Sequence, residues 1–423
     1  MLRHRLYSLE TRLAGPLELA VRSNMRVEII TALFYGVFFA VLLFVPVVLT
    51  RLGGSVTLVS IYLSLSYIGH IFSSISLVFL RRLPAKTFAT VSWTIGRIVF
   101  AFLGLASGSV SFLVLTGVFW LLEIVPNPAY TRILQSIYPL AHRGKILALI
   151  RLGMAIVILV VTPLAGRALD VFGYGVVFAI AGISGALAGL FFVRLKVIAP
   201  PSALLRQSTP NPSPQLAPSP SPISAMRLVL KDRRFLRYAL SIVLFGLAGL
   251  SVTPLFPNVQ VHQLHMSYTD IGLLGTVQSL TWVLGYLVWG RLIDRFGGVP
   301  CTVLTFVCQA IAPLTYAFAT SGWMLLPAAM GLGLVSAGAD ISLTSTCLEL
   351  ADPDHTQEYA AAQSTVIGAR GLIAPFIGVS LVGLGVPQPI VFALGSAVAL
   401  SAAWVAYGCR SKPTPLSDRH PHQ

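Results

Sequence analysis

Long apolar runs recur along the whole chain and constrain its fold more than any other feature. Twelve such runs follow one another, at residues 27–50, 55–80, 86–106, 110–135, 145–166, 173–193, 235–257, 269–293, 299–319, 322–349, 357–383 and 386–408. Each run is long enough to cross the hydrocarbon core of a bilayer as a helix. Only 10% of the residues are charged, whereas a soluble domain carries about 25%. The sequence therefore predicts an all-α integral membrane protein with twelve transmembrane helices.

The positions of the basic residues predict the orientation in the membrane. The net charge is +15, and most Lys and Arg fall in every second break between the runs, as at Arg81, Arg82, Arg143 and Lys145. Because Lys and Arg collect on the cytoplasmic side, both termini are predicted to be cytoplasmic in a multi-pass protein of the inner (plasma) membrane. Basic patches interleaved with aromatic residues are missing, so no nucleic acid partner is expected.

A stretch rich in proline and serine divides the chain into two halves. Residues 199–225 contain eight prolines, and such a composition cannot pack a core. The predicted organisation is a cytoplasmic N-terminal segment, a six-helix bundle, a linker, a second six-helix bundle and a cytoplasmic tail, at residues 1–26, 27–194, 195–234, 235–408 and 409–423. Six is an even number, so the two bundles are predicted to be parallel.

The two halves carry traces of an internal repeat. Pro46 matches Pro257 at a shift of 211 residues, and Asn127 matches Asp340 at a shift of 213. Parallel six-helix repeats place a substrate site near the midplane, between the halves.

The turn between the eighth and ninth predicted helices reads "GRLIDRFGG", with Gly290, Asp294, Arg295 and Gly297. It resembles the G-x-x-x-D-R-x-G signature of the major facilitator superfamily. "PLAGRALDVFGYGVVF" at 163–178 and "IGARGLIAPFIG" at 367–378 are similar to the helix 5–6 junction and helix 11 of bacterial members. The resemblance implies alternating access, with helices 1, 2, 4, 5, 7, 8, 10 and 11 lining a central cavity.

The resemblance also implies a cytoplasmic gate. The helix 8–9 turn is expected to meet the inner end of helix 5, where Arg143 lies, when the cytoplasmic side is closed. Asp294 is expected to bind the positive N-terminus of that helix. The matching turn of the first half departs from the signature and carries Arg81 and Arg82. We expect it to meet the acidic residues 349–358 at the inner end of helix 11, so that the two latches have opposite polarity.

Ionisable residues inside the predicted helices are candidates for function, because each is costly in a membrane. Glu123 and Asn127 lie four residues apart on one predicted helix face. Pro126 and Pro128 are expected to break the backbone hydrogen bonds there. In so apolar a setting, Glu123 is expected to favour its neutral form and to handle a proton or substrate. The alternative is an ion pair with Arg97 or Arg151.

Further candidates lie in the other helices that the resemblance assigns to the cavity. Arg151 and Arg370 are expected to face each other and to attract an anionic or polar substrate, since Arg binds carboxylate and phosphate with two donors. The alternative for Arg370 is an ion pair with Asp340 or Glu123.

Three uncharged or weakly basic residues complete the candidate set. His70 is expected either to relay protons or to be a hydrogen-bonded packing residue. Gln278 and Trp282 lie one turn apart and form either a substrate wall or an aromatic packing contact.

Two motifs resemble functional signatures but predict structure instead. "HMSYTD" at 265–270 has the spacing of an acyltransferase motif, yet Ser267 and Asp270 are placed to cap a helix. "GISGALAG" at 182–189 is a small-residue face for close helix packing. The chain has no Walker sequence, metal-ligand spacing or convergent nucleophile set, so no cofactor, metal or enzyme activity is predicted.

The sequence therefore predicts a monomeric secondary active transporter, which exports a small molecule in exchange for protons. Its expected partners are that substrate, the lipid bilayer and protons. The alternatives are an uptake system or facilitative permease for a small polar or anionic solute, and a non-transporting receptor built on a transporter fold.

Overall fold

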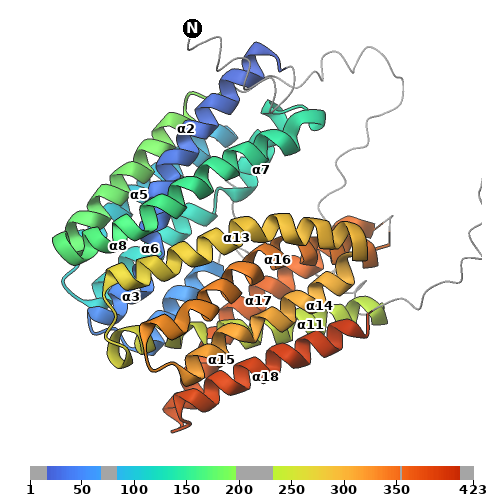
Figure 1. The fold of residues 1–423 in the computed structure, drawn as a ribbon. Coiled ribbons are helices and arrows are strands. Elements are labelled where there is room, and N and C mark those ends of the chain that lie inside the picture. The colour runs from blue at the N-terminus through green and yellow to red at the C-terminus, as the bar shows by residue number, and fades with distance from the viewer. Residues whose placement is uncertain (1–16, 68–82, 197–231, 353–354, 410–423) are drawn as a thin grey trace, which may run out of the picture.

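The computed structural model describes residues 17–67, 83–196, 232–352 and 355–409, and every regular element in these ranges is a helix. Figure 1 shows the helices gathered into two bundles, one from each half of the chain. The first contains α2 (Leu19–Leu42), α3 (Val45–Arg51), the helix Val56–Tyr67, α5 (Ala85–Ala101), η1 (Phe102–Leu105), α6 (Ser109–Ile124), α7 (Asn127–Ile137) and α8 (Leu140–Phe192). The second contains α11 (Arg233–Leu250), η2 (Thr253–Leu255), α12 (Phe256–Asn258), η3 (Val259–Gln263), α13 (Tyr268–Phe296), α14 (Gly298–Gln309), α15 (Ile311–Phe318), η4 (Gly322–Leu325), α16 (Leu326–Leu350), α17 (Thr356–Gly383) and α18 (Gln388–Tyr407).

The helices account for the twelve predicted membrane spans. Ten stretches of the described chain are long and apolar enough to cross a membrane. One of them, His142–Phe192, covers two predicted runs, and the shorter helix Val56–Tyr67 covers the start of another. The predicted all-α membrane fold is therefore confirmed, and the described helices are consistent with twelve spans in two bundles. The proline-rich residues 199–225 lie outside the described part of the chain.

Proline and glycine set the places where the helices break. α6 ends at Ile124 and α7 begins at Asn127, because Pro126 has no N–H to continue the ladder. α8 changes direction at Gly173, whose φ of 74° lies in the left-handed region. Only glycine adopts this backbone conformation without a Cβ penalty. Two membrane-spanning helices are thus joined with almost no loop.

Each half ties its first helix to its last at the same end of the bundle. In the first half, the Asn24 side chain donates to the Lys196 carbonyl and accepts from the Lys196 N–H, both at 2.8 Å. In the second half, Arg237 donates to the Gly408 carbonyl at 2.7 Å. We call this end the inner end, because the sequence predicts that it is cytoplasmic, and the opposite end the outer end.

Two local predictions are confirmed. Ser267 and Asp270 form a reciprocal capping box at the start of α13, with N···O distances of 3.0 and 3.1 Å. The small-residue face of 182–189 packs closely on α5, since a Cβ at Gly182 would lie 2.5 Å from the Ala101 nitrogen.

The two halves are hydrogen-bonded to each other at the outer end. The Asp170 carboxylate of α8 accepts from the backbone N–H groups of Tyr268 and Thr269 at 3.0 and 2.8 Å, at the N-terminus of α13. The Arg51 guanidinium donates to the Met266 carbonyl at 2.5 Å and lies 3.7 Å from the centre of the Tyr268 ring. An anion at a helix N-terminus is favoured by the helix dipole. Figure 1 shows α8 and α13 close at this end and diverging toward the inner end.

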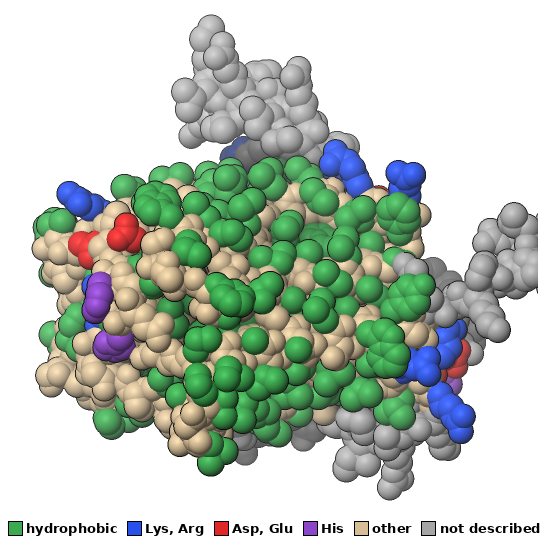
Figure 2. Space-filling view, turned by 60° about the horizontal axis from the view of Figure 1, so that its bottom comes forward, with side chains coloured by type: hydrophobic (Ala, Val, Ile, Leu, Met, Phe, Trp, Pro, Cys, Tyr) green, Lys and Arg blue, Asp and Glu red, His purple; other side chains and the backbone are tan. Residues whose placement is uncertain are grey.

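Hydrophobic and charged side chains occupy different zones of the surface. Figure 2 shows a broad band of hydrophobic side chains across the face in view, with charged side chains gathered toward its two ends. This distribution fits a bundle whose long helices run through the apolar core of a bilayer.

Replacing Gly173 by Ala is expected to lower the free energy of unfolding by about 1–2 kcal/mol, because a Cβ is strained in the left-handed region. The measurement is thermal unfolding of the purified protein in detergent. Gly144→Ala is the matched control on α8, since nothing lies within 4 Å of the added Cβ there. Equal unfolding temperatures for the two variants would contradict the role assigned to Gly173.

Candidate functional site

A cavity of about 280 Å³ lies between the two halves. Its walls are mostly apolar and include Pro46 and Pro257, the two prolines matched by the internal repeat. Gln278 of α13 also lines the cavity, whereas Trp282 is not among its lining residues. The Gln278 amide makes no hydrogen bond to another side chain or carbonyl of the described residues, so it is available to a bound molecule. The nearby Gln260 is already engaged, because its amide donates to the Tyr316 hydroxyl at 2.7 Å.

Charged groups from both halves face the space inward of this cavity. Asp340 of α16 is exposed and accepts a hydrogen bond from the Tyr286 hydroxyl of α13 at 2.5 Å. Arg151 of α8 is also exposed, and it acts electrostatically on Tyr286 across the boundary between the halves. Both halves therefore contribute polar residues to the space between them. Arg151 comes from the first half, and Gln278 and Asp340 come from the second. Trp282, also on α13, packs beside Tyr286 with a ring-centre distance of 5.7 Å.

Glu123 is held in an ion pair inside the first half. The Arg97 guanidinium of α5 donates to its two carboxylate oxygens at 2.9 and 3.1 Å. A third guanidinium nitrogen donates to the Gly185 carbonyl at 3.1 Å, and both side chains are buried. The sequence offered an ion pair as the alternative to a proton-handling or substrate-handling role for Glu123, and the structure contains such a pair. Of the two arginines that the sequence offered as partners, the structure selects Arg97.

Asn127 does not share the environment of Glu123. The helix breaks between them at Pro126, so Glu123 is buried at the end of α6 while Asn127 is exposed at the start of α7. The two residues differ in exposure although the backbone stays in the right-handed helical region at Val125 and Pro126.

Arg370 of α17 packs within the second half rather than beside an acid. Its guanidinium donates to the Ile242 carbonyl and lies 5.2 Å from the centre of the Phe245 ring on α11. Gly246 provides the space, because a Cβ at this position would collide with the Arg370 side chain. Among the described residues, neither Asp340 nor Glu123 forms an ion pair with it.

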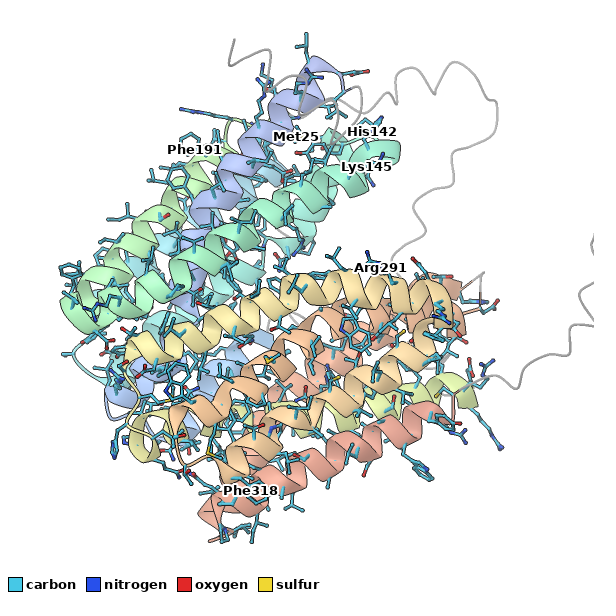
Figure 3. All side chains as sticks on the ribbon, in the orientation of Figure 1. Met25, His142, Lys145, Phe191, Arg291 and Phe318 are labelled. Atoms are coloured by element: carbon cyan, nitrogen blue, oxygen red, sulfur yellow. The ribbon has the colours of Figure 1, made fainter. Side chains whose placement is uncertain are left out.

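The predicted gate residues are apart in this conformation. Asp294 and Arg295 are exposed, and Asp294 makes no hydrogen bond or ion pair with another residue of the described ranges. Figure 3 shows Arg291 of α13 and His142 and Lys145 of α8 on different halves of the molecule. The expected latch between Asp294 and the N-terminus of α8 is therefore not formed, because the halves diverge at the inner end.

The inner ends instead make contacts within each half. Gly297 ends α13 with a φ of 84°, and the Glu349 carboxylate accepts from the N–H groups of Gly298 and Val299 at 2.8 and 3.3 Å. The sequence placed Glu349 opposite the basic turn of the first half. His70, Arg81 and Arg82 lie outside the described residues, so their predicted roles stay predictions.

Sequence reasoning missed two acidic residues. Asp170 forms the outer contact between the halves, and its signal was an acid at the boundary between two apolar runs. Glu28 is buried in α2, with only 3% of its surface exposed. Its signal was a single acid inside the first apolar run, 27–50.

Two parallel helical bundles with a cavity between them define the class of this protein, a membrane transporter fold. The model of the Major Facilitator Superfamily matches residues 27–375 and 238–422, and the chain belongs to this family. No curated protein sequence matches the chain.

Solved transporters share the fold at low sequence identity. The nucleoside transporter NupG is 14% identical, with a TM-score of 0.69 over 93% of this chain and 100% of that one. The structure of a point mutant of NupG gives the same values. The human organic anion transporter MFSD10 (TETRAN) is 15% identical, with a TM-score of 0.61 over 92% of this chain and 100% of that one.

Replacing Glu123 by Gln is expected to destabilise the protein by about 3–5 kcal/mol, because Arg97 would keep a buried charge without its counter-ion. The measurement is thermal unfolding in detergent. The double variant Arg97→Gln/Glu123→Gln removes both charges and is expected to recover most of the loss. A single variant as stable as the wild type would show that the pair contributes little.

Replacing Asp294 by Lys is expected to shift the protein further toward forms open at the inner end, because Lys repels the positive N-terminus of α8. The readout is the labelling rate of a cysteine introduced at the exposed Thr344, one turn from Asp340. Adding Arg143→Asp is expected to reverse part of the change. Unchanged labelling would mean that Asp294 has no part in closing the inner end.

Proposed function

We propose that this protein is a secondary active transporter that exports a small molecule in exchange for protons by alternating access of its two halves. The observation that carries the proposal is the placement of Arg151 on one half opposite Tyr286 and Asp340 on the other. These groups lie inward of a cavity that reaches the hydrogen-bonded outer contact. A molecule bound between them touches both halves, so its binding depends on how the halves are arranged.

The proposed substrate is small, amphipathic and polar or anionic. Arg151 offers a two-pronged donor to a carboxylate or phosphate. The cavity beyond it offers apolar walls, with Phe44 from the first half and Phe256 from the second, and the free amide of Gln278. The names of the two structural relatives, a nucleoside transporter and an organic anion transporter, belong to the same range of solutes.

The proposed direction is export, and the open inner end supports loading of a substrate from that side. With the halves apart at the inner end, a cytoplasmic substrate reaches Arg151 and Asp340 directly. Closure of that end and separation at Asp170 would then expose the substrate to the outside. A proton gradient directed inward supplies the driving force, since the chain holds no nucleotide-binding sequence.

Transport is tested in inside-out membrane vesicles with an acid interior, using uridine and p-aminohippurate as a nucleoside and an aromatic anion. Wild-type protein is expected to accumulate at least one probe, and an ionophore that dissipates the gradient is expected to abolish the accumulation. Arg151→Ala is expected to reduce the initial rate about 10- to 100-fold, the worth of a hydrogen bond to a charged group.

Arg167→Ala is the matched control, because Arg167 is an exposed arginine near the outer end of the same helix. Accumulation that requires an inward gradient in right-side-out vesicles would identify uptake instead of export. An Arg151→Ala rate equal to that of the control would remove Arg151 from the substrate site.

A further inference from the structure

Glu28 is a buried acid that the proposed substrate site does not use. It lies on α2, is 3% exposed, and belongs to the inner third of the first half. One carboxylate oxygen accepts a hydrogen bond from the Tyr130 hydroxyl at 3.0 Å, and the other accepts one from the Tyr138 hydroxyl at 2.5 Å. Both tyrosines belong to the segment around α7, so a single carboxylate joins α2 to α7.

The Glu28 carboxylate has no cationic partner among the described residues. The nearest basic residues on its own helix are Arg22 and Arg26. On α8, Arg143 donates to the backbone carbonyl of Tyr138 at 3.0 Å rather than to the carboxylate. Figure 3 shows Met25 of α2 on the same side of the molecule as the α8 residues His142 and Lys145. Neither of those two forms an ion pair with Glu28.

The two buried acids of the first half therefore differ in kind. Glu123 has a cationic partner, Arg97, which donates two hydrogen bonds to its carboxylate. Glu28 is surrounded by apolar side chains, with Ala32, Ile133 and Ile146 in the adjoining core cluster. Burial without a counter-ion disfavours the charged carboxylate, while donated hydrogen bonds favour it. The balance between the two effects is the property that a reversible proton site needs.

The hydroxyl groups of the two tyrosines can satisfy both protonation states. A hydroxyl donates one hydrogen bond and accepts others. When Glu28 is ionised, both hydroxyls donate to it. When it is protonated, its O–H can donate to the oxygen of one tyrosine while the other still donates to the carbonyl oxygen. In the protonated state, the accepting tyrosine has to turn its own hydrogen away from Glu28, so protonation rearranges the hydrogen bonds between α2 and α7.

One residue of the proposed substrate site, Arg151, acts on a residue of the Glu28 site. Tyr130 is half-buried, and Arg151 acts electrostatically on it. The Trp93 ring of α5 packs edge-to-face on Tyr130 at 5.6 Å between ring centres. Trp93 also donates to the Glu123 carbonyl at 3.0 Å, so its ring links the Glu28 site to the Arg97–Glu123 pair.

We propose that Glu28 is the residue that binds and releases the coupling proton, with Tyr130 and Tyr138 as its positioning residues. The proposal rests on the proposed function for its role in transport. Protonation changes the hydrogen bonds between α2 and α7 beside Arg151, and so links the proton to the substrate site.

Proton binding is tested on the purified full-length protein by infrared difference spectroscopy across about pH 4 to 9, the range around ordinary carboxyl titration. The wild type is expected to show a titrating carbonyl band of a protonated carboxyl group, which Glu28→Gln abolishes and Glu123→Gln retains. Tyr138→Phe is expected to move the band to higher pH, because it removes a donor that favours the ionised form. A band that survives in Glu28→Gln and does not move in Tyr138→Phe overturns the proposal.

The transport role is tested in proteoliposomes with uridine and p-aminohippurate, in two modes. In Glu28→Gln, accumulation of the probe driven by a pH gradient is expected to fall at least 10-fold. Exchange of labelled for unlabelled probe without a gradient is expected to be retained. Full gradient-driven accumulation in Glu28→Gln would overturn the coupling role alone. Wild-type protein that shows neither mode would count against the proposed function, and the infrared experiment would still decide whether Glu28 binds a proton.

Discussion

The structure depends on one constraint: in the apolar core of a bilayer, polar groups must find their partners within the protein. Backbone groups meet it by forming helices, which is why every regular element in the described ranges is helical. Where a helix must break, as at Pro126 or Gly173, the residue type either lacks the N–H or tolerates the unusual backbone angle. The breaks thus fall where they cost least.

The same constraint explains three different arrangements of buried charge. Arg97 and Glu123 neutralise each other with paired hydrogen bonds. Arg370 has no acid beside it among the described residues and is held by a backbone carbonyl and an aromatic face. Glu28 is held by two tyrosine hydroxyls. These arrangements differ in how readily a buried carboxylate can take up a proton. An ion pair opposes protonation of a carboxylate, and neutral hydrogen-bond donors oppose it less.

The charged residues that face the space between the halves are exposed rather than buried. Arg151 and Asp340 lie within membrane helices yet are exposed, because the halves diverge at the inner end while the Asp170 contact holds them at the outer end. Each end has an acidic residue that can interact with a helix N-terminus, Asp170 at the outer end and Asp294 at the inner end. The outer contact uses an acid at a helix N-terminus, the same physics that the sequence predicted for Asp294 at the inner end.

The class, the number of helices and the division into two halves were determined by the sequence alone, because apolar run length and the proline-rich stretch respond to the bilayer rather than to neighbours. Local features with short-range causes were equally accessible, such as the Ser267–Asp270 cap and the break at Pro126. The partners of the buried charges were not. Arg97 lies 26 residues from Glu123, and Glu28 lies 102 and 110 residues from its tyrosines. Only the tertiary structure decided these pairings, since they depend on how whole helices rotate and pack against each other.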